Sequence, residues 1–497
     1  MKKMFIAINK AISYIKQCFK PVMKFEVIRL HDVIKDQLFS IDEITAEDLQ
    51  LEDFLKKYDS NITSCGSEVF HHWLYSVKSK DQILQIQDDI KKIYKSDRSF
   101  LERTLNKYVG KQNQGNFIRD LWNGFSIDNW IINHFYTLFL FNLLTCTVLC
   151  ILFTKLFIIL FFINNFILYL LTNSNIYHIS SSLGYFLKLC FSLSKIEKKQ
   201  KLSLSQKTPN YKKFSSLFIQ LIFFKEGIGG PNSGDIFSIL LDYLRIFLDL
   251  ELFAYKRTEK FIKNNIEDVK KIYLYIGYMD CLLNTCHIMD KNKCCFSKIL
   301  EECEINFKNM NHPLLEASVP QSRNVSKNLI ITGLNMSGKT TFMKSLGLNQ
   351  ILATSFGFCF AETFSTCILN VLSSICINDE LLNGKSRYYA EAERIVHIKE
   401  LLEKSRCLCL IDEILSGTNS EERIYGSTRI LNEFAKNESI LIAATHDTQI
   451  AENICSEYAP VYFDGEINND KIKFDYKIKE GIVSKKNGLL LLKLLGL

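Results

Sequence analysis

A run of 33 residues with a single charge, at Lys155, sets the strongest limit on how this chain folds. The run covers 139–171, and the apolar block around it covers about 135–172. A helix that crosses a bilayer needs roughly 20 apolar residues, so the block can hold almost two. The alternative is a buried hairpin in a soluble core, but so long a run with only one charge disfavours it. We therefore expect a transmembrane helical hairpin within 131–194.

Two positions fit the turn of this hairpin. Lys155 can lie at a tight turn between two short helices. Alternatively, Asn164-Asn165 forms the turn and the second helix runs toward Leu189, which leaves Lys155 inside the first helix. A charge at the centre of a membrane helix costs about 2.5–3.5 kcal/mol unless its side chain reaches the interface. The sequence leaves both arrangements open.

Lysine-rich segments flank the apolar block on both sides. Residues 195–213 follow it and read as a basic, solvated linker, and the first 24 residues carry six lysines and no acid. Positive flanks mark the cytoplasmic side, so both ends of the block are expected there, with an even number of crossings. The predicted location is therefore a membrane, with the remaining domains in the cytoplasm.

The N-terminal segment, 1–40, begins with a basic amphipathic pattern. One helical face carries the apolar residues Phe5, Ile8, Ile12, Ile15 and Phe19. Such a helix either lies on an anionic membrane surface or packs on the protein's own core, and the sequence supports both. No continuous apolar stretch follows the lysines, so the segment does not read as a signal peptide.

Composition fits a mostly soluble chain with a small membrane part. Of 497 residues, 47% are hydrophobic, and the mean hydropathy is +0.03. The net charge of +7 permits an anionic partner without requiring one. The sixteen cysteines form no regular framework and are interpreted as reduced thiols. The densest cluster lacks the paired spacing of a zinc site and comprises Cys281, Cys286, His287, Cys294 and Cys295.

The periodicity of the chain changes once along its length. Residues 41–130 and 214–302 show helical spacing and are predicted to form helices. From about 303 to 497, short β-prone runs such as KNLIIT, CLCLID and SILIAAT alternate with helical stretches. This alternation predicts a mostly parallel sheet flanked by helices.

A nucleotide-binding loop follows the first of these strands. The segment from Gly333 to Thr340, GLNMSGKT, fits the P-loop pattern in full and opens a helix. Its glycines let backbone N–H groups face phosphates, and the helix N-terminus adds its dipole. Lys339 is expected to reach the β- and γ-phosphates, and the Thr340 hydroxyl to bind Mg²⁺. The residues predicted to bind nucleotide are Gly333, Asn335, Met336, Ser337, Gly338, Lys339, Thr340 and Thr341.

Two further strands end in groups suited to phosphate chemistry. CLCLID ends in Asp412, expected to hold Mg²⁺ through water, followed by Glu413, expected to polarise the attacking water as a general base. Alone, this pair would be explained as a helix cap. SILIAAT leads to His446, a candidate sensor of the γ-phosphate, which would otherwise be explained as structural.

Between these strands, 378–395 contains a second helix start. Ser386 follows a Gly-Lys pair, and its helix N-terminus can receive phosphate. Within one subunit, Ser386 would be an ordinary capping residue.

Together these motifs resemble the ATPase domain of the MutS family, a branch of the ABC-type ATPases. The resemblance rests on GLNMSGKTTFMKS, DELLNGKSRYYAE, LCLIDEILSGTNSEER and AATHD, with NHPLL at 311–315 similar to the beginning of that domain. Residues 51–90 and 214–310 resemble the two halves of the family's helical core. The resemblance thus implies that 41–130 and 214–302 form the two halves of an all-α core, the second acting as a lever. The fold class implied is an α/β P-loop ATPase domain, C-terminal to an all-α core interrupted by a transmembrane hairpin.

The sequence departs from the family in two places. The mismatch-reading domain with its Phe-x-Glu wedge is absent, because Lys24-Phe25-Glu26 does not have that spacing. The DNA-clamping insertion between the core halves is also missing, and the apolar block takes its place. A hairpin suits this position because both core halves must stay on one side of the membrane.

The resemblance implies a homodimer of head-to-tail ATPase domains that uses ATP and Mg²⁺. Ser386 of one subunit would then complete the nucleotide site of the other, so that nucleotide occupancy drives a change of shape. The expected function is a membrane-anchored, MutS-like ATPase, related to DNA mismatch repair proteins but without mismatch reading, for which DNA binding stays open. The alternatives are a membrane-remodelling or transport-linked ATPase with no nucleic-acid role, and an ATP-sensing scaffold with negligible turnover.

Overall fold

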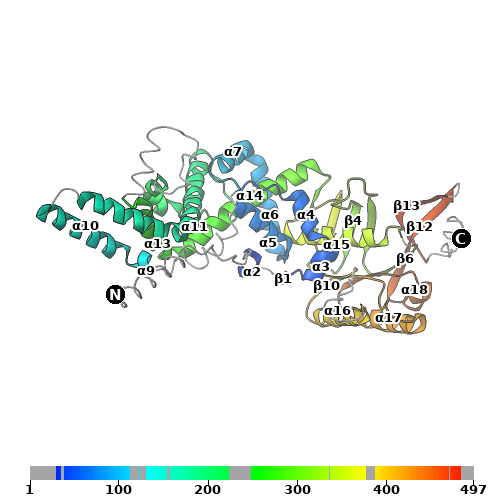
Figure 1. Ribbon diagram of the computed structural model, residues 1–497. Coiled ribbons are helices and arrows are strands. Elements are labelled where there is room, and N and C mark those ends of the chain that lie inside the picture. The colour runs from blue at the N-terminus through cyan, green and yellow to red at the C-terminus, as the bar shows by residue number, and fades with distance from the viewer. Residues whose placement is uncertain are drawn as a thin grey trace, which may run out of the picture. The chain divides into compact units, whose positions relative to one another are not determined.

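The computed structural model describes residues 30–34, 38–111, 121, 130–153, 157–222, 248–334, 336–375, 387–468 and 471–482. The chain divides into two compact units (Figure 1). Unit 1 comprises Met1–Ile34, Asn61–Val69 and Ser96–Cys281, and unit 2 comprises Lys35–Ser60, Phe70–Lys95 and Leu282–Leu497. The amphipathic pattern predicted near the N-terminus lies outside the described residues.

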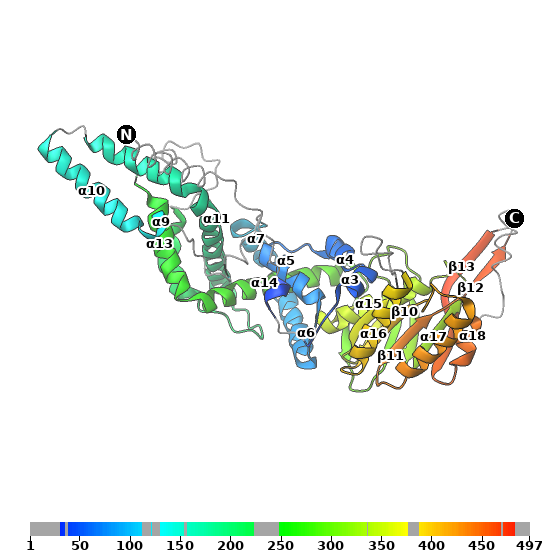
Figure 2. The same cartoon turned by 60° about the horizontal axis from the view of Figure 1, so that its bottom comes forward.

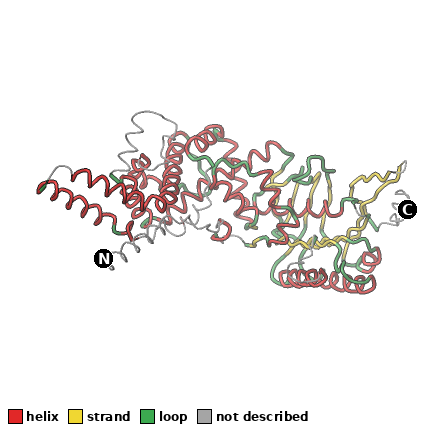
Figure 3. The backbone as a smooth tube through the Cα atoms, viewed as in Figure 1, coloured by secondary structure: helices red, strands yellow, loops and turns green. Residues whose placement is uncertain are grey.

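All the regular secondary structure in the described part of unit 1 is helical, and loops join the helices (Figure 3). Its elements are α2 (Leu30–Val33), α7 (Arg98–Tyr108), α9 (Trp130–Asn133), α10 (Phe135–Leu152), α11 (Phe157–Lys199), η1 (Tyr211–Ile222) and α13 (Leu250–Lys263). Two helices contribute residues to both units, α5 (Ser64–Leu74) and α14 (Ile266–Lys291).

A buried carboxylate fixes the start of α5 within unit 1. Asp280 accepts hydrogen bonds from the Thr63 N–H at 2.7 Å and the Thr63 hydroxyl at 2.6 Å. A Cβ at Gly66 would lie 2.2 Å from the Asp280 carboxylate, so only glycine fits there. This close approach explains why a glycine stands at position 66, in the first turn of α5.

The apolar block folds as a helical hairpin of α10 and the first part of α11 (Figure 2). The rings of Phe139 and Phe161 meet edge to face at 5.8 Å. Asn142 of α10 donates to Asn165 at 2.8 Å and accepts from Asn164 at 2.9 Å. The alternative with the turn at Asn164-Asn165 is therefore wrong: both residues lie inside α11, where their amides bond across to α10. Lys155 itself lies outside the described residues.

Within the described residues, α10 is the one helix long and apolar enough to cross a membrane. Its mean hydropathy is 2.1, and only 11% of it is buried inside the protein. The apolar part of α11, Ile158–Tyr169, is shorter. α11 continues to Lys199, so the first residues of the predicted linker 195–213 belong to this helix instead.

Unit 2 holds all the described strands, in three sheets. The order of the largest is β13-β12-β6-β11-β10-β9, with only β13 antiparallel. Its strands are β6 (Asn328–Gly333), β9 (Asn370–Ser374), β10 (Cys407–Asp412), β11 (Ile440–Ala444), β12 (Tyr458–Asn468) and β13 (Lys471–Glu480). The second sheet has the order β5-β4-β8-β3-β7, formed by β3 (Cys295–Ile299), β4 (Ile305–Met310), β5 (Gln321–Val325), β7 (Phe358–Cys359) and β8 (Thr363–Thr366). A third pairs β1 (Phe39–Ser40) with β2 (Ser76–Val77). The α/β arrangement predicted for this part of the chain is confirmed.

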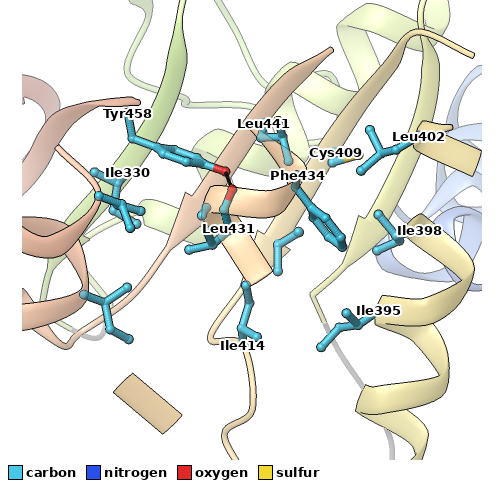
Figure 4. Packing of buried hydrophobic residues seen from close by; sticks show 14 of the residues in the cluster. Ile330, Ile395, Ile398, Leu402, Cys409, Ile414, Leu431, Phe434, Leu441 and Tyr458 are labelled. Carbon is cyan, nitrogen blue, oxygen red and sulfur yellow. Dashed lines mark hydrogen bonds between the residues drawn. The ribbon is translucent and has the colours of Figure 1, made fainter. Parts of the chain in front are cut away.

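Helices cover the large sheet from both sides. α15 (Lys339–Ser355) contacts strands of both large sheets and is almost entirely buried. The other face packs on α16 (Arg387–Leu402), α17 (Ser420–Phe434) and α18 (Thr448–Asn453), through a core that includes Ile398, Leu431 and Phe434 (Figure 4). Each fully buried side chain of this size contributes about 1.5–3 kcal/mol, and this burial holds the strands in register.

The compact units do not follow the domain boundaries expected from sequence. Three helices predicted for the all-α core pack in unit 2: α3 (Glu43–Asp48), α4 (Leu51–Tyr58) and α6 (Lys80–Lys95). Strand β3 also begins before residue 303. Helical periodicity identifies a helix and its apolar face but does not identify the surface that the face covers.

Candidate nucleotide-binding site

Three neighbouring parallel strands bring the predicted site residues to one edge of the large sheet. Strands β6, β11 and β10 are adjacent and parallel. The P-loop follows β6, Asp412 ends β10, and His446 follows β11. Because the carboxyl ends of parallel strands share one edge, these groups converge there.

The two P-loop glycines have conformations that other residues rarely adopt. Gly333 has φ +143°, and a Cβ there would lie 2.6 Å from the Phe463 carbonyl oxygen. Gly338 has φ +109° directly before α15. Any other residue at either position would strain the loop or push it from β12. Asn335 lies outside the described residues.

Lys339, the first residue of α15, turns its side chain back over the loop. Its ammonium donates to the carbonyls of Gly333 at 2.8 Å and Leu334 at 3.1 Å. Burial lowers the pKa of Lys339, while Asp412 and Glu413 oppose that shift. A buried cation beside backbone amides is the arrangement that attracts a phosphate.

Thr340, the residue after Lys339, contacts Asp412, the other residue predicted to hold Mg²⁺. The Thr340 hydroxyl donates to the Asp412 carboxylate at 2.6 Å. Burial raises the pKa of Asp412, and the Thr340 hydrogen bond and Lys339 act in the opposite direction. A hydroxyl and a carboxylate are hard oxygen donors, so this pair fits Mg²⁺ held together with substrate phosphates.

Ser337 supplies a further polar group inside the loop. It is buried, and within the described residues its hydroxyl has no hydrogen-bond partner. A buried hydroxyl without a partner costs about 1–3 kcal/mol, which a bound phosphate oxygen would recover. This observation independently fits a phosphate at the P-loop.

The predicted base and sensor lie in direct contact. His446 Nδ1 is 3.0 Å from Glu413 Oε1. Glu413 has φ +53°, a left-handed conformation that is uncommon outside glycine and occurs at functional sites. Asp447 accepts from Arg423 of α17 at 2.9 Å, which ties the segment after His446 to that helix.

Two adjoining cavities share the P-loop residues Gly338 and Thr341 together with Tyr476. The larger, about 470 Å³, is lined by the P-loop, Asp412 and Glu413. The smaller, about 300 Å³, has apolar and aromatic walls that include Leu315, Phe342, Phe463 and Tyr476. A charged cavity beside an apolar one matches the phosphate half and the nucleoside half of a nucleotide.

No pattern in the sequence indicates the walls of the smaller cavity. His312 and Leu315 lie in NHPLL, which was assigned only as the start of the domain. Tyr476 lies on β13 and has φ +53°. These residues come from distant parts of the chain, so no local spacing could have brought them together.

Ser386 and the segment 376–386 lie outside the described residues. Helix α16 begins at Arg387, directly after Ser386. On the P-loop itself, the side chain of Met336 is 87% exposed. The placement of Ser386 against a second subunit therefore stays a prediction.

Comparison with known proteins agrees with the motifs. Residues 329–497 match MutS domain V, which is a P-loop ATPase domain. The protein "DNA mismatch repair protein MutS" of Fusobacterium nucleatum is 27% identical over 262 residues, covering 50% of this chain and 29% of that protein. The MutS proteins of Listeria welshimeri and Clostridium botulinum (strain Okra / Type B1) are 25% and 26% identical, covering 51% and 50% of this chain and 31% and 28% of their own lengths.

The matched part of this chain thus covers 28–31% of the length of these curated relatives. The carboxyl ends of β6, β10 and β11, which carry the predicted site residues, fall inside the matched residues. Over residues 329–497, this chain is therefore similar to domain V, the ATPase domain, of proteins named for DNA mismatch repair.

Proposed function

We propose that this protein is a membrane-anchored, MutS-like ATPase that binds and hydrolyses ATP as a head-to-tail homodimer. The observation that carries the proposal is the convergence of Lys339, Thr340, Asp412 and Glu413 at one sheet edge. The triphosphate occupies the cavity over the P-loop, and the nucleoside occupies the apolar cavity beside it.

The chemistry follows from what each side chain can do at that edge. Lys339 and the backbone of the loop bind the β- and γ-phosphates. Thr340 and Asp412 would hold Mg²⁺, which neutralises charge that develops on the phosphates. Glu413 orients the attacking water and accepts its proton, and His446, 3.0 Å away, holds the carboxylate in place and contacts the γ-phosphate.

Large exposed side chains on the P-loop and on helices α16 and α17 support a second copy of the chain as partner. Met336 of the P-loop is 87% exposed, Tyr425 of α17 is 71% exposed and Tyr389 of α16 is 54% exposed. Aromatic and methionine side chains are enriched in protein interfaces. In a head-to-tail pair, Ser386 of one subunit would cap the γ-phosphate bound by the other.

The α10–α11 hairpin supports anchoring in lipid. The exposed side chains along both helices are predominantly large and apolar, including Phe141 and Leu144 on α10 and Ile159 and Ile163 on α11. The side-chain amides of Asn142, Asn164 and Asn165 bond to one another between the two helices. Such a hairpin satisfies its polar groups internally, as the bilayer demands.

The same hairpin favours a second candidate, an ATPase acting on membrane or protein partners without nucleic acid. The relatives are named for DNA mismatch repair, but the match covers about a third of their length. DNA binding by this chain is therefore one arm of the test and not part of the claim.

The test is purification of the full chain with and without detergent, followed by an ATPase assay with and without duplex DNA. The proposal expects detergent-dependent solubility and Mg²⁺-dependent turnover. Affinity for DNA is measured against salt, since neutralised phosphates give a steep negative slope of log K against log salt concentration. Absence of DNA binding at about 50 mM salt, with turnover intact, selects the second candidate. Absence of turnover under all conditions contradicts both.

Pairing is tested by mixing two inactive variants. Lys339→Ala removes the P-loop cation, and Ser386→Ala removes the serine proposed to act across the interface. In a mixed dimer, one of the two sites keeps both residues, so mixing restores part of the activity. A mixture as inactive as its components would contradict completion of the site by the second subunit.

A further inference from the structure

The floor of the apolar cavity is a loop held from outside the large sheet. Residues 311–320, which connect β4 to β5, supply His312, Leu315, Ser318 and other walls of that cavity. The loop has no regular secondary structure. Its shape therefore depends on the side chains that hold its backbone.

Helix α4 provides two of those side chains. The Tyr58 hydroxyl donates to the Pro313 carbonyl at 2.6 Å. The Lys57 ammonium donates to the Pro313 carbonyl at 3.2 Å and the Leu314 carbonyl at 3.1 Å. Tyr58 is buried, and burial raises its pKa to about 12, so its hydroxyl stays a donor throughout the neutral range.

Tyr58 is itself fixed from two directions. Its ring lies against Phe54, with centroids 4.7 Å apart, and against Phe360 at 5.4 Å. Its backbone carbonyl accepts from the buried Asn284 amide of α14 at 2.9 Å. Asn284 also accepts from the Ser60 hydroxyl at 2.5 Å, so the end of α4 is fastened to α14.

The other side of the loop is fastened to the P-loop helix. Asn349 of α15 donates to the Asn311 carbonyl at 3.0 Å and accepts from the Phe360 N–H at 2.8 Å. Within the loop, Ser318 bonds both Asn311 and His312. The loop thus lies between α15, which carries the phosphate site, and α4, which is bonded to α14.

We propose that Tyr58 is a positioning residue for the nucleoside half of the ATP site, linking that half to helix α14 through Asn284. The inference rests on the proposed function, because it assumes that ATP occupies the two cavities. Tyr58 touches no part of the site directly. It fixes the carbonyl of Pro313, and with it the neighbouring His312 and Leu315 that line the apolar cavity.

The affinities for two ligands distinguish loss of this positioning role from general damage to the fold. ATP uses both cavities, whereas inorganic tripolyphosphate can use only the phosphate cavity. Tyr58→Phe keeps the packed ring and removes only the hydroxyl. We expect the Kd of ATP to rise about two- to tenfold, the size of one net hydrogen bond, with tripolyphosphate affinity and kcat unchanged. The double variant Lys57→Met, Tyr58→Phe removes both donors and should shift the Kd of ATP further.

The matched control is Tyr94→Phe. The Tyr94 hydroxyl also donates to groups of α14, the Cys286 carbonyl at 3.2 Å and the Asp290 carboxylate at 3.1 Å, and Tyr94 lines neither cavity. This variant should leave both affinities at their wild-type values.

Binding is measured on the full chain in detergent, without Mg²⁺ so that no turnover occurs. An unchanged ATP affinity in Tyr58→Phe, or an equal loss of ATP and tripolyphosphate affinity, overturns the positioning role. If the wild type binds neither ligand, or Lys339→Ala binds both as well as the wild type, the proposed function fails instead.

Discussion

The hydroxyl of Thr340 lies 2.6 Å from the carboxylate of Asp412, although 72 positions separate them in the chain. This contact joins the first turn of α15 to the end of β10. It puts two oxygen ligands of the kind Mg²⁺ prefers beside a P-loop, in a cavity that Lys339 also lines. The pair therefore makes the metal requirement of this site testable by substitution.

Replacement of Thr340 should separate metal binding from folding. Thr340→Ser keeps the hydroxyl, and Thr340→Val keeps the shape without it. We expect Thr340→Val to lower kcat by at least about 100-fold and to require much more Mg²⁺, because metal stabilisation of the phosphates is worth several kcal/mol. Turnover measured against Mg²⁺ concentration provides the check. If turnover depends on Mg²⁺ concentration in the same way in the Val and Ser variants, Thr340 does not bind the metal.

His312 should make the stability of unit 2 depend on pH. Burial, followed by the charges of Lys344 and Lys57, lowers its pKa from 6.5 to about 4. The unfolded chain therefore binds more protons than the folded chain between these values, so stability falls as pH drops from about 6.5 to 4. From pH 7 to pH 5 the loss is about 2 kcal/mol.

Urea unfolding monitored at pH 7 and pH 5 measures this dependence. In His312→Gln, the difference between the two pH values should shrink, whereas His397→Gln, at an exposed position of α16, should behave as the wild type. An identical pH dependence in the wild type and His312→Gln would show that burial of His312 is not its cause.

Lysines introduced on the exposed face of α10 should release the protein from membranes. Phe141 and Leu144 are 67% and 64% exposed and lie in the middle of the helix. A lysine at the centre of a membrane helix costs about 2.5–3.5 kcal/mol, so the double change Phe141→Lys, Leu144→Lys should reduce the membrane-bound fraction sharply.

Alkaline extraction of membranes gives the bound fraction directly. Val396→Lys, at an exposed apolar position of α16, serves as the control and should stay in the membrane pellet. Recovery of the wild type in the soluble fraction would contradict anchoring by this hairpin.

The sequence predicted the elements whose signals are local. The strands before Gly333, Glu413 and His446 are short apolar runs that end in polar groups, and adjacent parallel strands bring such ends together. The turn of the hairpin was left open because asparagine favours turns. The Asn142 amide on the facing helix, which no local pattern indicates, keeps Asn164-Asn165 inside α11.

Features built from distant segments were not predicted. Tyr58 reaches Pro313 across 255 positions, and Tyr476 closes the site from the last described strand. Their side chains are ordinary aromatic residues in the sequence, and only the tertiary packing gives them neighbours at the nucleotide cavities. The same reason explains why α3, α4 and α6 pack in unit 2.

The most direct measurement of the central claim is the turnover of Glu413→Gln, with Glu433→Gln at an exposed position of α17 as the control. A positioned general base contributes about 10²- to 10⁴-fold, so the Glu413→Gln variant should lose turnover on that scale. It should nevertheless bind ATP and remain dimeric, because the P-loop is intact. Turnover equal to that of the wild type would contradict the assignment of this sheet edge as the site of ATP hydrolysis.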